Sequence, residues 1–139
     1  MVVATLLEHQ RTPWTTPETP LAEAARLMAA TGYGMLPVLC RDGRLIGMVA
    51  ERDVLRLAAE RRAGLRGLAV EAAMSRDPAA LPAGAPIDAA LRAIASAEAR
   101  HLPVCDSEGR VLGLVGLADL LRSGAALPIP ATTKEESRP

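Results

Sequence analysis

The sequence contains two copies of one unit, and this repeat constrains the fold more than any other feature. Residues 11–56 align with residues 77–122 without a gap, and fourteen of the 46 paired positions are identical. A chain of this composition would give roughly five identities by chance. The two copies predict a pseudo-symmetric body with two related clefts. The identical pairs include positions with demanding backbone geometry: Pro20 and Pro86, Pro37 and Pro103, Gly43 and Gly109, Gly47 and Gly113, Asp53 and Asp119.

The length suits one compact domain whose two copies share a core. The chain has 139 residues, of which 50% are hydrophobic, and this content excludes a disordered chain. Each copy is only about 50 residues, too short to bury much core alone. We expect a first repeat at 1–56, a helix end and linker at 57–69, a second repeat at 70–122, and a largely disordered tail at 123–139.

Charge and aromatic content exclude several classes of binding protein. Sixteen basic residues balance sixteen acidic ones, whereas nucleic-acid and membrane-surface binders need an excess of positive charge. Trp14 and Tyr33 are the only aromatic residues, so a single-strand stacking platform is not expected. The composition predicts no metal cluster and no catalytic nucleophile with an evident base. We therefore expect a binding protein rather than an enzyme.

Other features of the sequence indicate a cytoplasmic, bacterial protein. No leader segment or membrane span is expected from the apolar runs. Cys40 and Cys105 are out of register between the copies, so we expect reduced thiols in the cytoplasm. Lys134 is the single lysine among the sixteen basic residues, which is typical of a GC-rich bacterial source.

Each copy reads as strand, helix, strand, strand, helix, which predicts an α+β fold. In the first copy, Thr19 is expected to cap a helix with Pro20 at its first position, and Gly32 to end it. Apolar residues recur at helical spacing in both copies. They are Leu21, Ala24, Ala25 and Met28 in the first copy and Ile87, Ala90, Leu91 and Ile94 in the second.

A β-hairpin follows the helix in each copy. The predicted strands are 35–39 and 45–49 in the first copy and 101–105 and 111–115 in the second, with turns at Gly43 and Gly109. Pro37 and Pro103 cannot donate to a ladder, so we expect them at a sheet edge or a bulge. A second helix is expected to begin near Ala50 and near Gly116.

The sequence resembles a tandem pair of cystathionine β-synthase (CBS) domains. The resemblance rests on a pattern that occurs in both copies: a helix, a Leu-Pro-Val strand, a glycine turn and Gly-x-x-x-x-x-Asp. The resemblance spans about Val2–Arg122. It implies two repeats packed sheet to sheet, with two clefts that bind an adenosine-containing ligand: AMP, ADP, ATP, S-adenosylmethionine or a dinucleotide such as NAD. It also implies a regulatory module that acts on a partner protein, forms a homodimer and performs no chemistry of its own.

The resemblance assigns roles to the aspartates at paired positions of the two copies. Asp53 and Asp119 would each accept hydrogen bonds from ribose hydroxyls. The alternative is that each only complements the N-terminus of its helix. Gly47 and Gly113 would let the backbone approach a ligand. Family members that bind ligands usually have Ser or Thr three residues before the aspartate. Here these positions hold Ala50 and Gly116.

The two copies differ most just before the Leu-Pro-Val strand. The second copy has Arg100-His101 where the first has Gly34-Met35. By the resemblance, Arg100 and His101 would reach a phosphate, which predicts one charged cleft and one nearly apolar cleft. The alternatives are a surface arginine and a partly buried strand histidine. The remaining candidate ligand contacts are Met35, Pro37, Pro103, Arg52 as an aid to phosphate binding, and Trp14.

Trp14 allows three interpretations. It could stack on a base, fill the shared core or pack at a dimer contact. For the whole chain, the leading hypothesis is a stand-alone regulatory module that senses an adenosine ligand. The alternative is a dimerisation or protein-interaction module without a ligand, which Ala50 and Gly116 favour.

Overall fold

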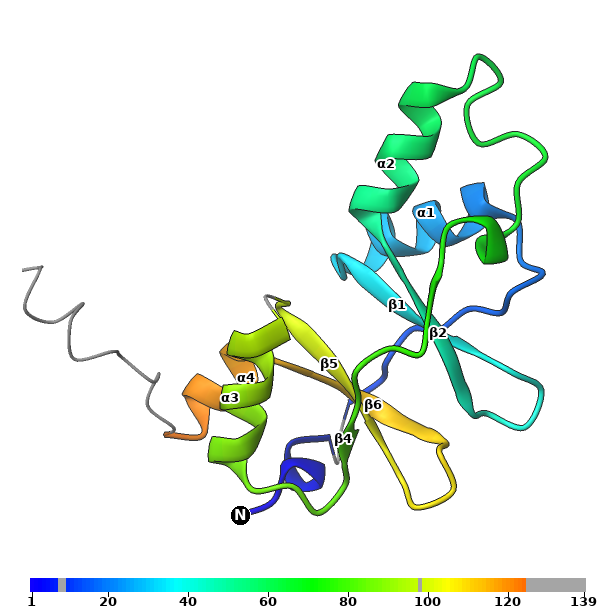
Figure 1. Ribbon diagram of the computed structural model, residues 1–139. Helices are drawn as coiled ribbons and strands as arrows, with labels where there is room; N and C mark the ends of the chain where they lie inside the picture. Colours follow the sequence, from blue (N-terminus) through cyan, green and yellow to red (C-terminus); the bar gives the residue numbers. More distant parts are fainter. Residues whose placement is uncertain (8–9, 98, 125–139) are drawn as a thin grey trace, which may run out of the picture.

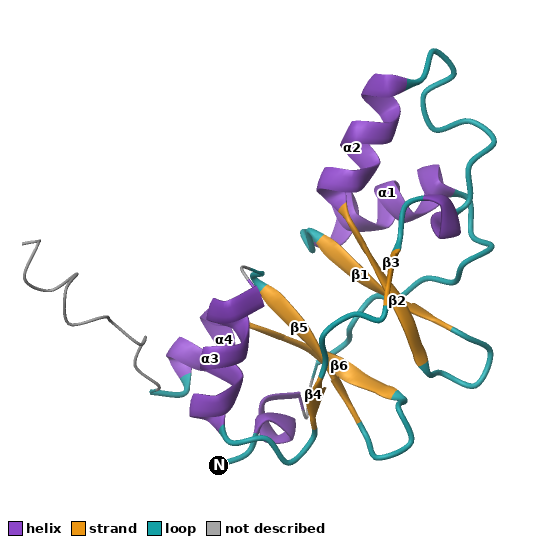
Figure 2. Cartoon of the chain, in the orientation of Figure 1, coloured by secondary structure: helices purple, strands orange, loops and turns teal. Residues whose placement is uncertain are grey.

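The computed structural model describes residues 1–7, 10–97 and 99–124, and it confirms the predicted α+β class (Figures 1 and 2). Almost all of the predicted tail, from residue 125 on, lies outside the described residues. Two halves lie side by side, each with a three-stranded sheet and two α-helices (Figure 2). The first half holds α1 (Leu21–Thr31), β1 (Met35–Leu39), β2 (Leu45–Ala50), α2 (Glu51–Glu60) and β3 (Ser75–Arg76). The second holds β4 (Leu81–Pro82), α3 (Ile87–Ala97), β5 (His101–Cys105), β6 (Val111–Gly116) and α4 (Leu117–Arg122).

The hairpins match the predicted strands to within one residue. β1 pairs with β2 and β5 with β6, both antiparallel, and the register places Met35 opposite Ala50 and His101 opposite Gly116. Gly43 and Gly109 adopt φ angles of 86° and 84°, which favour glycine in these turns. The two turns also meet across the molecule, because Leu45 N–H donates to Gly109 O at 3.0 Å and Val111 N–H to Gly43 O at 3.1 Å.

The two strand prolines have equivalent surroundings, beside a bulge and not on a free edge. The register shifts between Val38 and Leu39 after Pro37, and between Val104 and Cys105 after Pro103. A further segment pairs with each strand on its other side, since Thr15 forms a parallel bridge to Val38 and Leu81 of β4 pairs with Val104. Thr15 N–H donates to the Pro37 carbonyl at 3.0 Å, so this pairing does not need the missing N–H of the proline.

The helices follow the predicted apolar faces, but the predicted N-cap of α1 is wrong. Leu21, Ala24 and Met28 are buried, and Gly32 ends α1 with a φ of 78°. The helix begins at Leu21 with Pro20 at the cap position and without a side-chain cap. The Thr19 hydroxyl instead lies 2.7 Å from the hydroxyl of Thr16. The second helices begin at Glu51 and Leu117, beside the predicted positions.

Two short segments are exchanged between the halves. The 3₁₀-helix η1 (Val3–Leu7) precedes the first half in sequence but packs on the second, where Val3 N–H donates to Ala85 O at 2.8 Å. The 3₁₀-helix η2 (Val70–Ala72) packs on the first half, where Val70 N–H donates to Thr19 O at 2.8 Å. The N-terminal segment, drawn in blue, lies against the second half in Figure 1. Each half is therefore completed by a segment of chain that lies outside its own repeat.

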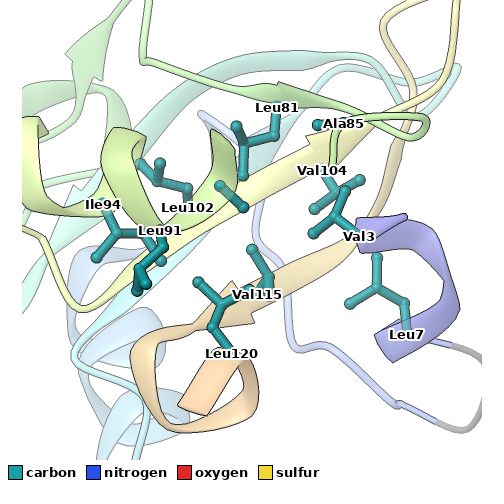
Figure 3. Packing of buried hydrophobic residues seen from close by; sticks show 11 residues of the cluster. Val3, Leu7, Leu81, Ala85, Leu91, Ile94, Leu102, Val104, Val115 and Leu120 are labelled. Carbon is teal, nitrogen blue, oxygen red and sulfur yellow. The ribbon is translucent and has the colours of Figure 1, made fainter. Parts of the chain in front are cut away.

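The exchanged segments contribute to two separate apolar cores. Val3 and Leu7 pack with Leu91, Val104 and Leu120 in the second half (Figure 3). Val70 joins the corresponding core around Leu21, Leu36 and Val49 in the first half. Val3 and Val70 are both fully buried, at 0% exposure. The prediction of one shared core is therefore wrong. Each half has its own core, and each core includes a valine from an exchanged segment.

Candidate functional site: two clefts at the seam between the halves

Two clefts of nearly equal size lie where the halves meet. The first cleft has a volume of about 570 Å³ and the second about 580 Å³. Both volumes are in the range of small-molecule sites. The first cleft is formed by the α1–β1 connection and the start of α2, with Ala97, Ala99, Arg100 and His101 of the second half. The second is formed by β5 and α4, with Tyr33 from the first half and Gln10 from the N-terminal segment that packs on the second half.

The clefts are related by the repeat, yet they share one basic pair. Gly34, Met35, Ala50, Glu51 and Arg52 of the first cleft correspond to Arg100, His101, Gly116, Leu117 and Ala118 of the second, 66 residues later. Arg100 and His101 nevertheless line both clefts. The predicted contrast between a charged and a nearly apolar cleft is therefore wrong. Residues before the Leu-Pro-Val strand sit on the seam, so they face both sides of it.

His101 occupies space that a side chain at position 116 would take. A Cβ built on Gly116 would lie 2.7 Å from His101 Nε2 and 2.8 Å from its Cδ2. The imidazole also faces Tyr33 of the first half, with ring centroids 5.2 Å apart at a tilt of 52°. In the first half the corresponding pair is Met35 and Ala50, where a Cβ is present. Gly116 is thus explained by the ring that packs on it.

The surroundings of His101 keep it mostly neutral. Burial is the main cause that lowers the pKa of His101 below its usual 6.5, and the charge of Arg100 lowers it further, while Asp119 opposes both. Burial also raises the pKa of Tyr33, and Asp119 adds to this increase. At neutral pH the second cleft therefore presents an uncharged imidazole next to a carboxylate and an arginine.

The two aspartates do not hold equivalent places. Asp119 lines the second cleft, whereas Asp53 is absent from the residues that line the first. Asp119 Oδ2 accepts a hydrogen bond from Gly116 N–H at 3.0 Å, and Asp119 Oδ1 pairs with Arg122. Asp53 pairs with Arg56 at 3.3 Å. A carboxylate can accept further hydrogen bonds beyond these, so Asp119 is the better placed of the two for a polar ligand group.

The glycines expected to approach a ligand approach the protein instead. A Cβ on Gly47 would lie 2.7 Å from the backbone oxygen of Ser75, and one on Gly113 would lie 2.9 Å from Gln10 Oε1 and 3.2 Å from Leu7. Ser75 follows η2, whereas Leu7 ends η1 and Gln10 follows it. The packing of the exchanged segments is therefore a sufficient reason for a glycine at both positions.

The remaining predicted site residues are scattered. Arg52 and Met35 line the first cleft as expected. Trp14 lies outside both clefts with 55% of its surface exposed, so it fills no core. Pro37 and Pro103 are fully buried in their strands.

Sequence reasoning missed Tyr33, Glu51 and Gln10. Tyr33 lines the second cleft from the opposite half, and Glu51 places its carboxylate in the first cleft beside Gly34. The Gln10 side chain accepts a hydrogen bond from Leu114 N–H at 3.2 Å. Tyr33 had one available signal, because it aligns with Ala99 directly before the residues already singled out. For Gln10 the sequence held none, since its partner lies 104 positions away.

Other kinds of site find no support in the described part of the chain. Within residues 1–7, 10–97 and 99–124, no group of three His, Cys, Asp or Glu side chains could hold a metal ion. Among the described helices, none is long and apolar enough to cross a membrane. Cys40 and Cys105 are both free thiols.

Comparisons with known proteins agree with the observed architecture. The family model for the CBS domain matches residues 9–60 and 70–126. An uncharacterized 17.7 kDa protein of Acidianus ambivalens is 31% identical over 107 residues, which cover 77% of this chain and 63% of that protein. Inosine-5'-monophosphate dehydrogenase of Thermoplasma acidophilum is 32% identical over 105 residues, covering 76% of this chain and 20% of the enzyme. The match thus spans less than two thirds of either relative.

A solved structure shows the same fold. The CBS-pair protein CBSX2 from Arabidopsis thaliana superposes with a TM-score of 0.79 at 22% identity, covering 88% of this chain and 93% of that one.

Proposed function

The chain belongs to the CBS domain family as a tandem pair, and we propose that it is a regulatory module that binds an adenosine-containing ligand at the seam between its halves. The observation that carries this proposal is the second cleft. It gathers Asp119, His101 and Arg100 of one half and Tyr33 of the other around about 580 Å³. These groups offer an acceptor for sugar hydroxyls, donors for an anion and an aromatic ring for a base.

Solved relatives of this fold support the choice of ligand class. CBSX2 has been crystallised in complex with AMP. Another CBS-domain pair has been crystallised with 5'-methylthioadenosine and S-adenosyl-L-methionine. All of these ligands carry an adenosine moiety, and we propose the same class for this chain. Asp119 would accept the ribose hydroxyls, and Arg100 with His101 would face a phosphate or carboxylate.

Regulation requires that the ligand binds two states of the protein unequally. The second cleft is built from both halves, so a ligand there would contact both and could change how they sit against each other. We propose that this change reaches a partner protein in the bacterial cytoplasm, where the two free thiols would stay reduced. The module would supply no catalysis of its own.

Thermal unfolding with AMP, ADP, ATP, S-adenosylmethionine and NAD tests the proposal. A ligand at 100 times its dissociation constant should add about 2.7 kcal/mol to the free energy of unfolding. Asp119→Asn should remove most of this gain, because the amide keeps the acceptor for Gly116 N–H but loses the charge. Asp53→Asn is the matched control and should keep the gain. A panel without any stabilising member would contradict the proposal.

One observation favours the alternative of an interaction module without a ligand. Protein atoms fill the space next to Gly47, Gly113 and Gly116. Positions that were expected to contact a ligand therefore already contact other parts of the protein. Under this alternative the ligand panel gives no stabilisation, while the oligomeric state still depends on the exposed apolar surface.

We also propose that the chain forms a homodimer through its first half. A groove of about 710 Å³ between α1 and α2 is lined mostly by apolar side chains, including Met28, Val54 and Leu55. Leu55 exposes 71% of its surface there. An exposed apolar groove of this kind is typical of a protein contact.

The dimer proposal is tested by light scattering on two matched variants. Leu55→Glu should shift the protein toward monomer, because a charge would be buried in the contact. Leu112→Glu places the same charge at an exposed leucine of β6 outside the groove and should leave the mass unchanged. Equal masses for all three proteins would contradict the proposed contact.

A further inference from the structure

One arginine and one imidazole are shared by the two clefts. Arg100 and His101 line the first cleft and the second. Each cleft adds one further arginine. Arg122 pairs with Asp119 in the second cleft, and Arg52 lines the first cleft together with Glu51. Arg100 is the arginine that lines both clefts, so its position affects how tightly each cleft holds an anion.

The packing of His101 favours ligand binding in the second cleft over the first. Its Nε2 lies 2.7 Å from the place of a Cβ on Gly116, and its ring faces Tyr33 at 5.2 Å. Gly116 and Tyr33 both line the second cleft and not the first. The second cleft also holds Asp119, which can accept the hydroxyls of a sugar. An adenosine ligand with a phosphate thus finds more of its partners in the second cleft.

A guanidinium shared by two phosphates brings their negative charges close together. Its planar fork gives its best hydrogen bonds to one pair of phosphate oxygens in one orientation. A second phosphate near the same group meets both an occupied donor and the charge of the first phosphate, and the two charges repel. A neutral ligand makes no such demand on Arg100.

We propose that the two clefts compete for Arg100 and His101, so that an anionic ligand in the second cleft weakens anion binding in the first. This inference rests on the proposed function, since it takes an adenosine ligand as the occupant. Under this competition the module responds mainly to the first anionic ligand that binds. Occupancy of the first cleft then depends on the charge of the ligand. By linkage, an anion in the first cleft weakens the second by the same factor.

The test is isothermal titration of the whole chain with AMP and with adenosine. In the original protein, AMP should bind the second cleft first and the first cleft weakly. Asp119→Asn should weaken the second cleft and leave Arg100 available. The first cleft should then bind AMP about 10-fold more tightly than the weak step of the original protein, in the usual range for coupled sites. Adenosine should show no such gain.

Two arginine variants identify the shared group. Arg100→Ala should lower AMP affinity and abolish the gain that Asp119→Asn produces. Arg92→Ala removes an exposed arginine of α3 that pairs with Asp88 at 3.2 Å and lines neither cleft, so AMP binding should be unchanged.

The possible outcomes separate the two proposals. If neither AMP nor adenosine binds the original protein, the proposed function fails and the competition fails with it. If AMP binds and Asp119→Asn gives no gain in the first cleft, or abolishes all binding, only the competition is overturned. A single AMP site that Asp119→Asn leaves unchanged overturns it as well, because the second cleft is then not filled first.

Discussion

Met35 faces Ala50 across β1 and β2, and His101 faces Gly116 across β5 and β6, at the same register of the same hairpin. The first pair is apolar and leaves room for a Cβ. The second pair places an imidazole where that Cβ would be. The two halves therefore keep one backbone plan while their side chains diverge at the seam. The repeat therefore determines where the clefts lie, and single residues determine which groups line each cleft.

The largest expected difference between the halves follows from adding a methyl group to each of the paired glycines, Gly47 and Gly113. Gly47→Ala should lower the free energy of unfolding by about 3 kcal/mol, because its Cβ would meet the backbone oxygen of Ser75. Gly113→Ala should cost only about 1 kcal/mol, because the end of the flexible Gln10 side chain can move aside. Urea unfolding measures both. Equal costs would mean that the exchanged segments pack alike on the two halves.

The next largest effect concerns the exchanged valines. Val3→Ala and Val70→Ala should each lower the free energy of unfolding by about 2 kcal/mol, because each removes two buried methyl groups from a filled core. Hydrogen exchange should locate the damage in the opposite half, so Val3→Ala should speed exchange in α3 and β5. Faster exchange in α1 and β1 instead would contradict the exchange of segments.

A smaller effect is expected on the pH dependence of folding stability, to which His101 of the second half contributes and Met35 of the first half does not. The pKa of His101 is lower in the folded protein than its usual 6.5, so the unfolded chain binds more protons as the pH falls below 6.5. Folding stability should therefore fall with pH in this window, and the loss is complete below the folded pKa. His101→Gln should remove this part of the slope. Melting temperatures between pH 5 and pH 8 that change in parallel for both proteins would contradict it.

The smallest expected difference between the halves is in the reaction rates of their two thiols, which involves no change in stability. Burial raises the pKa of the Cys105 thiol, and Asp106 adds to the increase. Cys40 in the first half is only half-buried. Reaction with a disulfide reagent should show a fast thiol and a slow one, and Cys40→Ser should remove the fast phase. Loss of the slow phase in that variant would reverse the assignment.

The local elements were predictable because their signals lie within a few residues. Gly43 and Gly109 mark turns that need positive φ, and the apolar spacing of α1 and α3 marks the buried faces. The existence of two clefts followed from the repeat itself. Arg100 and His101 could be singled out because they directly precede the recognisable Leu-Pro-Val motif, and both line the clefts.

The packing between distant segments could not be predicted. No local pattern shows that Val3 completes the core around Leu120, or that Ser75 fills the space beside Gly47. For the same reason, the sequence left an edge and a bulge open for Pro37 and Pro103, since it does not show that Thr15 and Leu81 pair with their strands. The charge of the clefts was misjudged because position in a repeat does not reveal that a residue on the seam faces both sides.

The most direct test of the account is a titration of the ¹⁵N-labelled protein with AMP, followed by amide chemical shifts. We expect the chemical shifts of the Gly116, Leu117 and Asp119 amides in the second cleft to change at the lowest ligand concentrations. Those of Ala50 and Glu51 in the first cleft should follow only at higher concentrations. Amide shifts confined to residues outside both clefts, or no shifts at saturating AMP, would contradict the claim that the seam between the halves is the ligand site.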